Sequence, residues 1–266
     1  MKSEIVMVDN GQKRPYPIEI IEQDLPLRGL PPSLEGKRFV QLSDLHSGFA
    51  HLEAAYELAI ERVNTEETEF LFITGDLVDD HAKPIDYPIH QFLKRFTTKH
   101  GTYAVMGNHE QRRGIVQAKR EFEKGNVRML TNESIQLDSG LWIGGIDDLL
   151  EGKPDFDKAL SPLPTNQTSL IMAHNPTTLD RLPNRDLVLF SGHTHGGQFR
   201  IPGIPTAAMV WLHLRCRQVS GWYSNGTTRG YTNRGLGVTG RPYRINCPAE
   251  IAIFRLTSVD SPPDVL

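Results

Sequence analysis

Short runs of apolar residues recur along this chain, and segments with a different apolar spacing follow several of them. The runs cover residues 38–42, 70–73, 103–106, 141–144, 170–173, 187–190 and 251–256. In residues 52–63, 89–96 and 115–122 the apolar positions recur every three or four residues, which is the spacing of one face of a helix. Strands that alternate with helices predict an α/β domain with helices on both faces of a sheet.

Two segments depart from this alternation. Residues 10–36 are rich in proline and glycine, so we expect residues 1–36 to form an extended lead-in that packs on a core made elsewhere. Residues 37–260 would then form a single domain. Within it, residues 197–249 contain seven arginines and neither Asp nor Glu. We interpret residues 198–246 either as a loop-rich, arginine-rich cap that contacts substrate or as part of the second half of the sheet.

Composition and charge limit the classes of protein to which the chain can belong. With 266 residues, 38% of them hydrophobic and 23% charged, it can form one large domain with a substantial core, and it is neither fibrous nor disordered. A formal net charge of −3 argues against duplex nucleic acid as a partner, because proteins that bind it are usually strongly basic. Cys216 and Cys247 could pair, but we interpret them as two ordinary thiols.

The apolar runs also bear on location. None of them approaches the roughly 20 consecutive apolar residues of a membrane-spanning helix. Residues 1–9 are too acidic, and their apolar run is too short, for a signal peptide. We therefore expect a cytoplasmic protein with no transmembrane segment in this chain.

Side chains that ligate metal ions follow five of the predicted strands. They lie in the blocks 43–46, 74–79, 107–110, 174–176 and 191–197. Binding sites of open α/β sheets are built at the carboxyl ends of the strands, which is where these blocks fall. Their Asp, Asn and His side chains offer mixed oxygen and nitrogen donors, which suit Mn²⁺, Fe²⁺, Zn²⁺, Ni²⁺ or Mg²⁺. A single block of this kind is weak evidence, but five in order indicate a metal site.

The spacing within the blocks supports this interpretation. Asp44 and His46 are two residues apart, as are His193 and His195, so each pair points to one side of an extended chain. The backbone can turn sharply just before three of the ligand residues, because they are preceded by Gly75, Gly107 and Gly192. The histidines outside the blocks lack such surroundings, and we interpret them as ordinary surface or core residues: His51, His81, His90, His100 and His213.

The five blocks resemble the pattern of the calcineurin-like metallophosphoesterase superfamily, which is D-x-H, G-D, G-N-H-[DE], H and G-H-x-H, and they cover residues 39–198. Residues 43–46, 192–198, 233–237 and 244–251 are similar to a bacterial subfamily of small phosphodiesterases, which includes pyrophosphatases that act on UDP-2,3-diacylglucosamine. The resemblance implies a four-layer α/β/β/α sandwich, in which two mixed sheets are flanked by helices. Many members of the subfamily begin with a membrane anchor or an export signal, and residues 1–9 show neither.

The resemblance also implies roles for individual residues. Carried over position by position, one metal ion would be bound by Asp44, His46 and His195, and a second one by Asn108, His174 and His193. Asp76 would bridge the two ions. His109 would not be a ligand, and it would contact the leaving-group oxygen or the phosphoryl oxygens.

These roles imply that a dinuclear centre hydrolyses a phosphoester. Two divalent ions about 3.5–4 Å apart can share a bridging hydroxide, which would attack phosphorus in line with the leaving group. Mn²⁺ is our first choice, with Fe, Zn, Ni and Mg as alternatives. His109 would protonate the departing oxygen. The expected substrate is a phosphodiester, either a small molecule or one linked to a nucleotide or a lipid, and a lipid-linked substrate would place the protein at the periphery of the inner membrane.

Further residues are candidates for supporting roles. Asp79 could orient a metal ligand or could cap the following turn, and the sequence leaves both roles open. The other acidic candidates are Asp80, Glu110, Asp147 and Asp148. Substrate phosphate could be bound by Arg113, Arg234 and Arg241, or by Arg112, and the rest of the substrate could contact Trp211, Trp222 or Tyr223. Alternatively, these arginines belong to a solvated surface and pair with acidic residues.

Two other functions stay open. A phosphomonoesterase or a protein phosphatase would use the same metal site with a differently shaped pocket. A non-catalytic scaffold would keep the fold and serve as a binding module. Scaffolds of this kind typically lose metal ligands, however, and here none of the expected ligands is missing.

Overall fold

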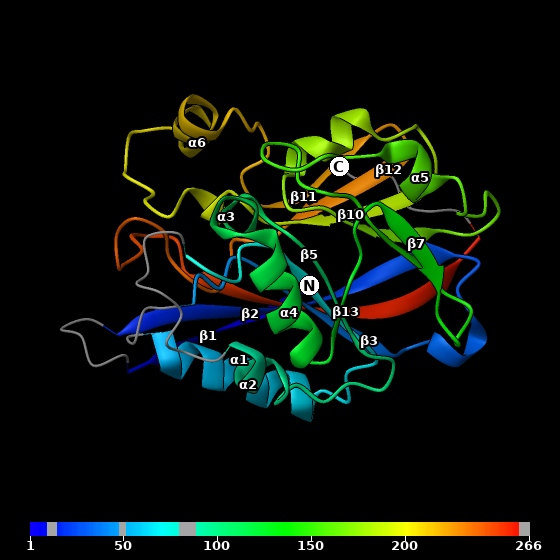
Figure 1. Cartoon of the computed structure of the whole chain (residues 1–266). Coiled ribbons are helices and arrows are strands. Elements are labelled where there is room, and N and C mark those ends of the chain that lie inside the picture. The colour runs from blue at the N-terminus through cyan, green and yellow to red at the C-terminus, as the bar shows by residue number, and fades with distance from the viewer. Residues whose placement is uncertain (10–14, 48–51, 80–88, 261–266) are drawn as a thin grey trace.

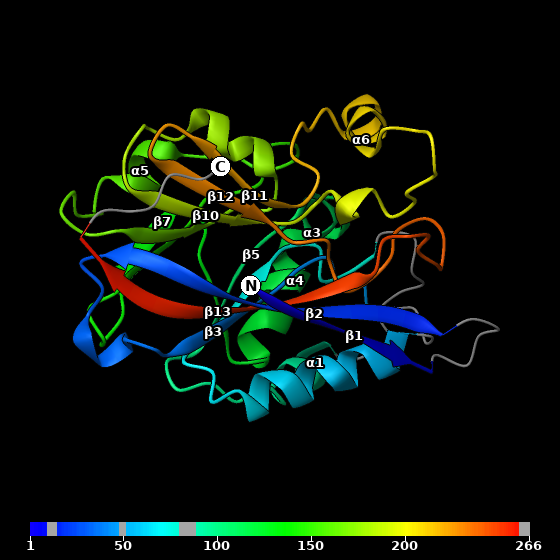
Figure 2. The same ribbon diagram turned by 180° about the vertical axis from the view of Figure 1, so that it is seen from behind.

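Two β-sheets pack face to face in this protein, with helices on their outer faces (Figures 1 and 2). The computed structural model describes residues 1–9, 15–47, 52–79 and 89–260. Three residues named above lie outside this described part, namely His51, Asp80 and His81, and so does the side chain of Arg113. The arrangement is the four-layer α/β/β/α sandwich predicted above.

The larger sheet has seven strands. In spatial order they are β1 (Lys2–Val8), β2 (Tyr16–Arg28), β13 (Ala249–Val259), β3 (Arg38–Leu42), β4 (Leu71–Thr74), β5 (Thr102–Val105) and β6 (Val127–Met129). Strands β3 to β6 run parallel to one another, whereas β13 is antiparallel to β3 and parallel to β2. Every residue of β4 and β5 is buried. A strand that is buried on both faces has a continuous apolar sequence, and this is the pattern by which both strands were predicted.

The smaller sheet has six strands. In spatial order they are β11 (Gly221–Asn225), β12 (Thr228–Thr232), β10 (Leu187–Ser191), β9 (Ser169–Met172), β8 (Trp142–Gly145) and β7 (Glu133–Gln136). The four central strands run parallel, and the edge strands β11 and β7 are antiparallel to their neighbours. Both sheets are therefore mixed, as expected.

Aromatic side chains fill the space between the sheets. Phe39 and Phe254 of the larger sheet stack with ring centroids 5.0 Å apart, and Phe190 of the smaller sheet meets Phe39 edge-on at 5.3 Å. All three side chains are fully buried. Edge-to-face and offset contacts of this kind add to the free energy gained by burying the rings, so this cluster fixes one sheet against the other.

Helices cover the two outer faces. The larger sheet packs against α1 (Glu53–Thr65), α2 (Ile89–Leu93) and α4 (Ile115–Lys124), and the smaller one against α5 (Phe156–Leu160) and the 3-10 helix η3 (Pro176–Arg181). The described part of the chain also contains the helices η1 (Pro32–Leu34), α3 (Asn108–Arg113), η4 (His195–Gly197) and α6 (Thr206–Leu214). The buried face of α1 is the one that its apolar spacing predicted, namely Ala55, Tyr56, Ala59, Ile60 and Val63.

The first 36 residues contribute more to the core than the sequence suggested. Strand β2 lies inside the larger sheet, between β1 and β13. Ile18 and Ile20 pack beneath the helices, while Leu25 and Leu27 enter the core between the sheets. Prolines and glycines near this strand hid its alternating pattern. The division into a lead-in and a domain that starts at residue 37 stays a prediction.

The arginine-rich segment 198–246 lies partly in a sheet and partly outside it, and its contact with substrate stays a prediction. Strands β11 and β12 belong to the smaller sheet, whereas α6 and the loops around it project from one corner of the molecule (Figures 1 and 2). Within the described residues, no helix has the length and apolar character needed to span a membrane. Both cysteines are buried and free, as interpreted from the sequence.

Candidate metal centre

The five blocks meet where the two sheets present the carboxyl ends of their parallel strands. The first three follow β3, β4 and β5 of the larger sheet, and the last two follow β9 and β10 of the smaller one. Nδ1 of His174 lies 2.8 Å from the carbonyl oxygen of Thr74, which joins the two edges directly. The expected site residues are all buried: Asp44, His46, Asp76, Asn108, His109, His174, His193 and His195.

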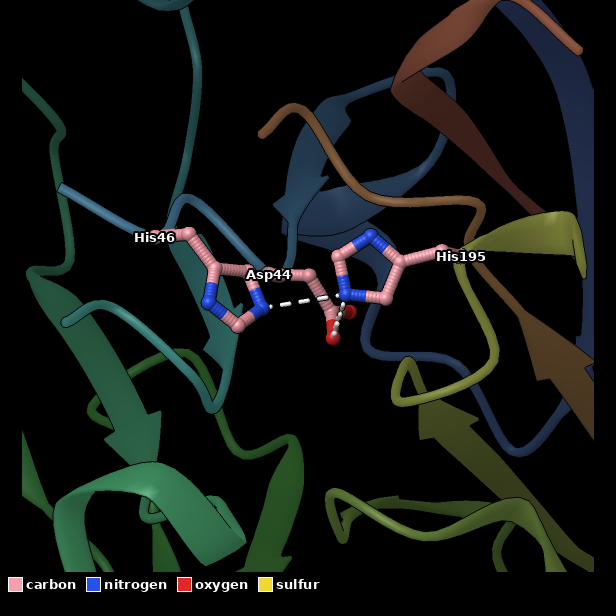
Figure 3. Close-up of side chains that lie close together, drawn as sticks. All are labelled: Asp44, His46 and His195. Carbon is pink, nitrogen blue, oxygen red and sulfur yellow. Dashed lines mark hydrogen bonds and ion pairs between the residues drawn. The ribbon is translucent and has the colours of Figure 1, made fainter. Parts of the chain in front are cut away.

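One group of donors consists of Asp44, His46 and His195 (Figure 3). Nε2 of His46 lies 3.0 Å from Nε2 of His195, and this second nitrogen lies 3.3 Å from Oδ1 of Asp44. On the other side of the His46 ring, Nδ1 lies 3.1 Å from Oδ2 of Asp79. A carboxylate can only accept this bond, so Nδ1 carries the proton and Nε2 is directed at the other two donors.

A second group consists of Asp76, His174 and His193, with Asn108 beside it. Nε2 of His174 lies 3.0 Å from Oδ2 of Asp76, 3.1 Å from Nδ1 of His193 and 3.2 Å from Oδ1 of Asn108. The same Oδ2 of Asp76 lies 3.8 Å from Nε2 of His46. The carboxylate of Asp76 therefore stands between the two groups of donors.

His109 adjoins both groups. Its Nε2 lies 3.9 Å from Oδ2 of Asp76, and its ring meets that of His46 edge-on with centroids 4.7 Å apart. The backbone N–H of His109 donates to Oδ1 of Asp76. His46, Asp79 and His109 also form a third compact group of donors.

These donors fit divalent cations. In two places a pair of imidazole nitrogens faces each other at about 3 Å, His46 with His195 and His174 with His193. One nitrogen of each pair must carry a proton to make a hydrogen bond, whereas a cation would accept both lone pairs. Nε2 of His193 is also buried and has no hydrogen-bond partner among the described residues. Nitrogen and carboxylate oxygen donors together suit Mn²⁺, Fe²⁺, Zn²⁺ and Ni²⁺.

Burial and neighbouring charges set the protonation states. Burial lowers the pKa of His193 to about 3, and the charge of His174 adds to this effect. Burial alone would raise the pKa of Asp76, but the charge of His174 and a hydrogen bond from it hold that pKa well below its usual range. Burial likewise opposes a charge on His174, yet Asp76 raises the pKa of His174 well above its usual value. Asp76 is thus an ionised carboxylate and His193 a neutral imidazole. His174 carries the proton that a bound cation would displace.

The backbone at this site adopts an uncommon conformation. Asp44, His46, Asp76, His193 and His195 have φ angles between 47° and 70°, in the left-handed region that side chains disfavour. Such conformations cost free energy and persist only where the surrounding structure enforces them, which happens often at functional sites. Gly107 and Gly192 leave the necessary room, because a Cβ atom at either position would overlap the carboxylate of Asp76 or of Asp44.

Glu110 ties two of the loops together. Its buried carboxylate accepts hydrogen bonds from the backbone N–H groups of Asp76, Val78 and Gly107, at 2.9, 3.0 and 2.8 Å. Burial, together with the charge of Asp76, raises the pKa of Glu110 to about 7. The sequence indicated Glu110 as one of several acidic candidates, but it did not show that the side chain turns back to the backbone of the Asp76 loop.

Asp147 and Asp148 order a neighbouring loop instead. Asp147 accepts hydrogen bonds from the side chain of Gln111 and the backbone of Lys153, and Asp148 accepts them from two backbone N–H groups that follow it. Among the ordinary histidines, His90 pairs with Glu121 and His100 with Glu69.

Arg244 is a supporting residue that the sequence analysis missed. Its guanidinium group donates to the carbonyl oxygens of His195, Arg234, Gly235 and Gly237 at 2.7 to 3.1 Å. A Cβ atom at Gly235 would lie 2.7 Å from Cβ of Asp44, so this loop packs directly on the first group of donors. The only sequence signal is an arginine near a glycine-rich stretch in a segment without acidic partners.

The arginines expected to bind substrate occupy different positions. Arg234 is buried and pairs with Glu250 at 2.6 Å and with Glu19 at 2.7 Å, which gives it a structural role. Arg241 is exposed. Arg112 lines a cavity and pairs with Glu151 at 3.0 Å.

This cavity, of about 640 Å³, opens at the donor groups. Its polar wall includes Asp76, Asn108, His109, His193 and His195. Its apolar wall includes Phe199, Met209, Val210 and Leu214 from η4 to α6, and His213 of α6 also lines it. The site therefore offers charge on one side and an apolar surface on the other.

Comparison with known proteins gives this geometry a context. Residues 37–197 match the family model described as Calcineurin-like phosphoesterase. An uncharacterized metallophosphoesterase of Helicobacter pylori (strain J99) is 33% identical over 229 residues, which are 82% of this chain and only 59% of that protein. The uncharacterized metallophosphoesterase YkuE of Bacillus subtilis (strain 168) is 30% identical over 262 residues, which are 92% of this chain and 88% of that protein. The crystal structure of a putative 5′-nucleotidase from Staphylococcus aureus has a TM-score of 0.44 and 13% identity, over 75% of this chain and 49% of that one.

Proposed function

Because this chain belongs to the calcineurin-like phosphoesterase family, we propose that it is a phosphodiesterase that uses two divalent cations. The observation that carries the proposal is the position of Asp76. Its Oδ2 lies 3.0 Å from His174 and 3.8 Å from His46, one imidazole from each group of donors. A carboxylate so placed is suited to bridge two cations, and paired cations are a common solution to phosphoester hydrolysis.

Each group of donors would hold one cation. Asp44, His46 and His195 would hold the first, Asn108, His174 and His193 the second, and Asp76 would be shared. Mn²⁺ is our first choice, and Fe, Zn, Ni and Mg are alternatives. When bound, such cations supply Lewis acidity, which neutralises charge on the phosphoryl oxygens and lowers the pKa of water.

The chain's own residues would position the substrate and handle its protons. His109 lines the cavity and lies against Asp76, so it could give a proton from its imidazole to the departing oxygen. Asp79 would hold the His46 ring, and Glu110 would hold the loop of Asp76. Arg112, which lines the cavity, could contact a substrate phosphate.

The shape of the cavity supports a diester as the substrate. A phosphodiester carries two organic groups, and the wall formed by Phe199, Met209 and Val210 provides an apolar surface beside the donors. A small-molecule, nucleotide-linked or lipid-linked diester could satisfy this arrangement. The net charge of −3 argues against a nucleic-acid duplex.

The test combines metal content with hydrolysis. We expect about two metal ions per chain by elemental analysis, and bis-p-nitrophenyl phosphate hydrolysed faster than p-nitrophenyl phosphate after stripping and adding back Mn²⁺. Asp76→Ala should lose both metal and activity. Faster turnover of the monoester would indicate that the protein is a phosphomonoesterase and not a phosphodiesterase. Full metal loading without turnover of either compound would indicate a binding scaffold, and a chain that takes up no metal would overturn the proposal.

A further inference from the structure

The outer face of α6 is apolar and exposed. The helix, Thr206–Leu214, contains no Asp, Glu, Lys or Arg, and Val210 is the one of its residues that is buried. Ala208, Trp211 and Leu212 are three and four positions apart and so share a face. Trp211 is 47% exposed and Leu212 is 61% exposed. Figures 1 and 2 show that α6 stands clear of both sheets at one corner of the molecule.

Two loops near α6 carry further exposed apolar side chains. Ile201 and Ile204 precede α6 and are 43% and 47% exposed, and Tyr243 and Ile245 in the loop after β12 are 48% and 39% exposed. The two loops are joined, because the backbone N–H of Arg200 donates to the carbonyl oxygen of Ile245 at 2.9 Å. We define the α6 surface as Ile201, Ile204, Trp211, Leu212, Tyr243 and Ile245.

Exposed arginines lie in the same segment of the chain as the α6 surface. Residues 197–249 carry seven arginines and no acidic residue, although the whole chain has a net charge of −3. The guanidinium carbon of Arg215 lies 4.9 Å from the centroid of the Trp211 ring. Arg217 and Arg241 are also exposed. Exposed cations thus accompany exposed apolar side chains.

We infer that the α6 surface docks on an anionic lipid bilayer. Tryptophan and tyrosine prefer the boundary between headgroups and acyl chains, and leucine and isoleucine gain free energy by entering it. Arginines beside them are attracted by the negative potential of anionic lipids. An acidic protein would satisfy the arginines, but a bilayer satisfies both the arginines and a projecting apolar helix.

Docking would also place the cavity close to the bilayer. Val210 of α6 lines the cavity, whereas Trp211 and Leu212, the next residues of the same helix, are exposed on its outer face. A bilayer in contact with the α6 surface would therefore lie beside the cavity mouth. The inference concerns location only and does not depend on the proposed hydrolysis.

The experiment is cosedimentation of the full chain with sucrose-loaded vesicles. We expect binding to vesicles of phosphatidylglycerol and phosphatidylcholine, weaker binding to phosphatidylcholine alone, and a decrease as salt is raised. The double variant Trp211→Ser/Leu212→Ser should bind about tenfold more weakly, because two apolar side chains no longer enter the bilayer. The matched control is Val116→Ser on α4, since Val116 is 61% exposed like Leu212 but lies outside the α6 surface.

Several outcomes would overturn the inference. They are no binding of the wild-type chain to anionic vesicles, equal binding by the double variant, or an equal loss in Val116→Ser. Sedimentation velocity tests whether the α6 surface binds a second copy of the chain instead. If the wild-type chain is a dimer and the double variant a monomer, the α6 surface is a dimer interface and not a bilayer-binding surface. An unchanged melting temperature of the double variant shows that it folds. Because no turnover is measured, failure of the proposed hydrolysis leaves this test intact.

Discussion

The carboxylate of Asp79 lies 3.1 Å from Nδ1 of His46, and both side chains are fully buried. Because the carboxylate fixes the proton on Nδ1, Nε2 of the same ring is directed at Asp44 and His195. Of the two roles that the sequence left open for Asp79, orientation of a metal ligand is the one that this contact supports.

We predict that Asp79→Ala weakens metal binding by about 10- to 100-fold, which is the usual cost of losing a residue that orients a ligating histidine. Asp79→Asn should have a smaller effect, since its amide oxygen can still accept from Nδ1 of His46. Titration with a competing chelator measures the affinity. Equal affinities of wild type and Asp79→Ala would contradict the orienting role.

The proposed proton donor should be separable from the metal ligands. His109→Gln is expected to retain its metal ions, because His109 is not among the proposed ligands, and to lower kcat by about 100- to 10,000-fold. Asp76→Asn should lose metal and activity together. Elemental analysis and kcat, measured side by side on both variants, distinguish these cases. Loss of metal from His109→Gln would instead make His109 a ligand, in line with its contact with His46 and Asp79.

His193 should make the metal-free chain sensitive to acid. Its pKa is lowered from 6.5 to about 3 in the folded chain, so between these values the unfolded chain binds more protons. The stability that His193 contributes is therefore full above about pH 6.5 and is lost as the pH falls toward 3. Denaturant unfolding across this range should show a smaller dependence on pH for His193→Gln than for wild type, by up to about one proton. The prediction would be contradicted if the free energy of unfolding depended on pH equally in wild type and His193→Gln.

Arg244 should support the first group of donors through the backbone. Arg244→Ala removes five hydrogen bonds to four carbonyl oxygens, and the free energy of unfolding should fall by at least about 2 kcal/mol. Metal uptake should fall toward one ion per chain, because His195 and the loop beside Asp44 lose their anchor. Arg244→Lys should recover only part of this, since an ammonium group cannot span the same carbonyls. The control is Arg217→Ala at an exposed position, which should change neither quantity.

Local chemistry allowed the sequence alone to determine the family and the candidate donors. Strands β3, β4, β5, β9 and β10 are buried on both faces, so they appear as apolar runs without any knowledge of their neighbours. The donor residues lie directly behind these runs. The predicted fold class and the resemblance to the superfamily are accordingly confirmed by the architecture and by the family match over residues 37–197. The metal ligands, the number of cations and the diester substrate stay predictions.

Tertiary structure decided what depends on contacts between distant segments. The sequence analysis did not assign β2 to a sheet, because the burial of this strand comes from a partner far along the chain, β13. His46 and His195 are 149 positions apart, and only the packing of one sheet on the other brings their rings together. The same packing turns Arg234 toward Glu19 and Glu250 and directs Arg244 to the backbone beside Asp44. Residue types and local spacing are properties of a short stretch of chain, whereas the direction in which a side chain points depends on the whole fold.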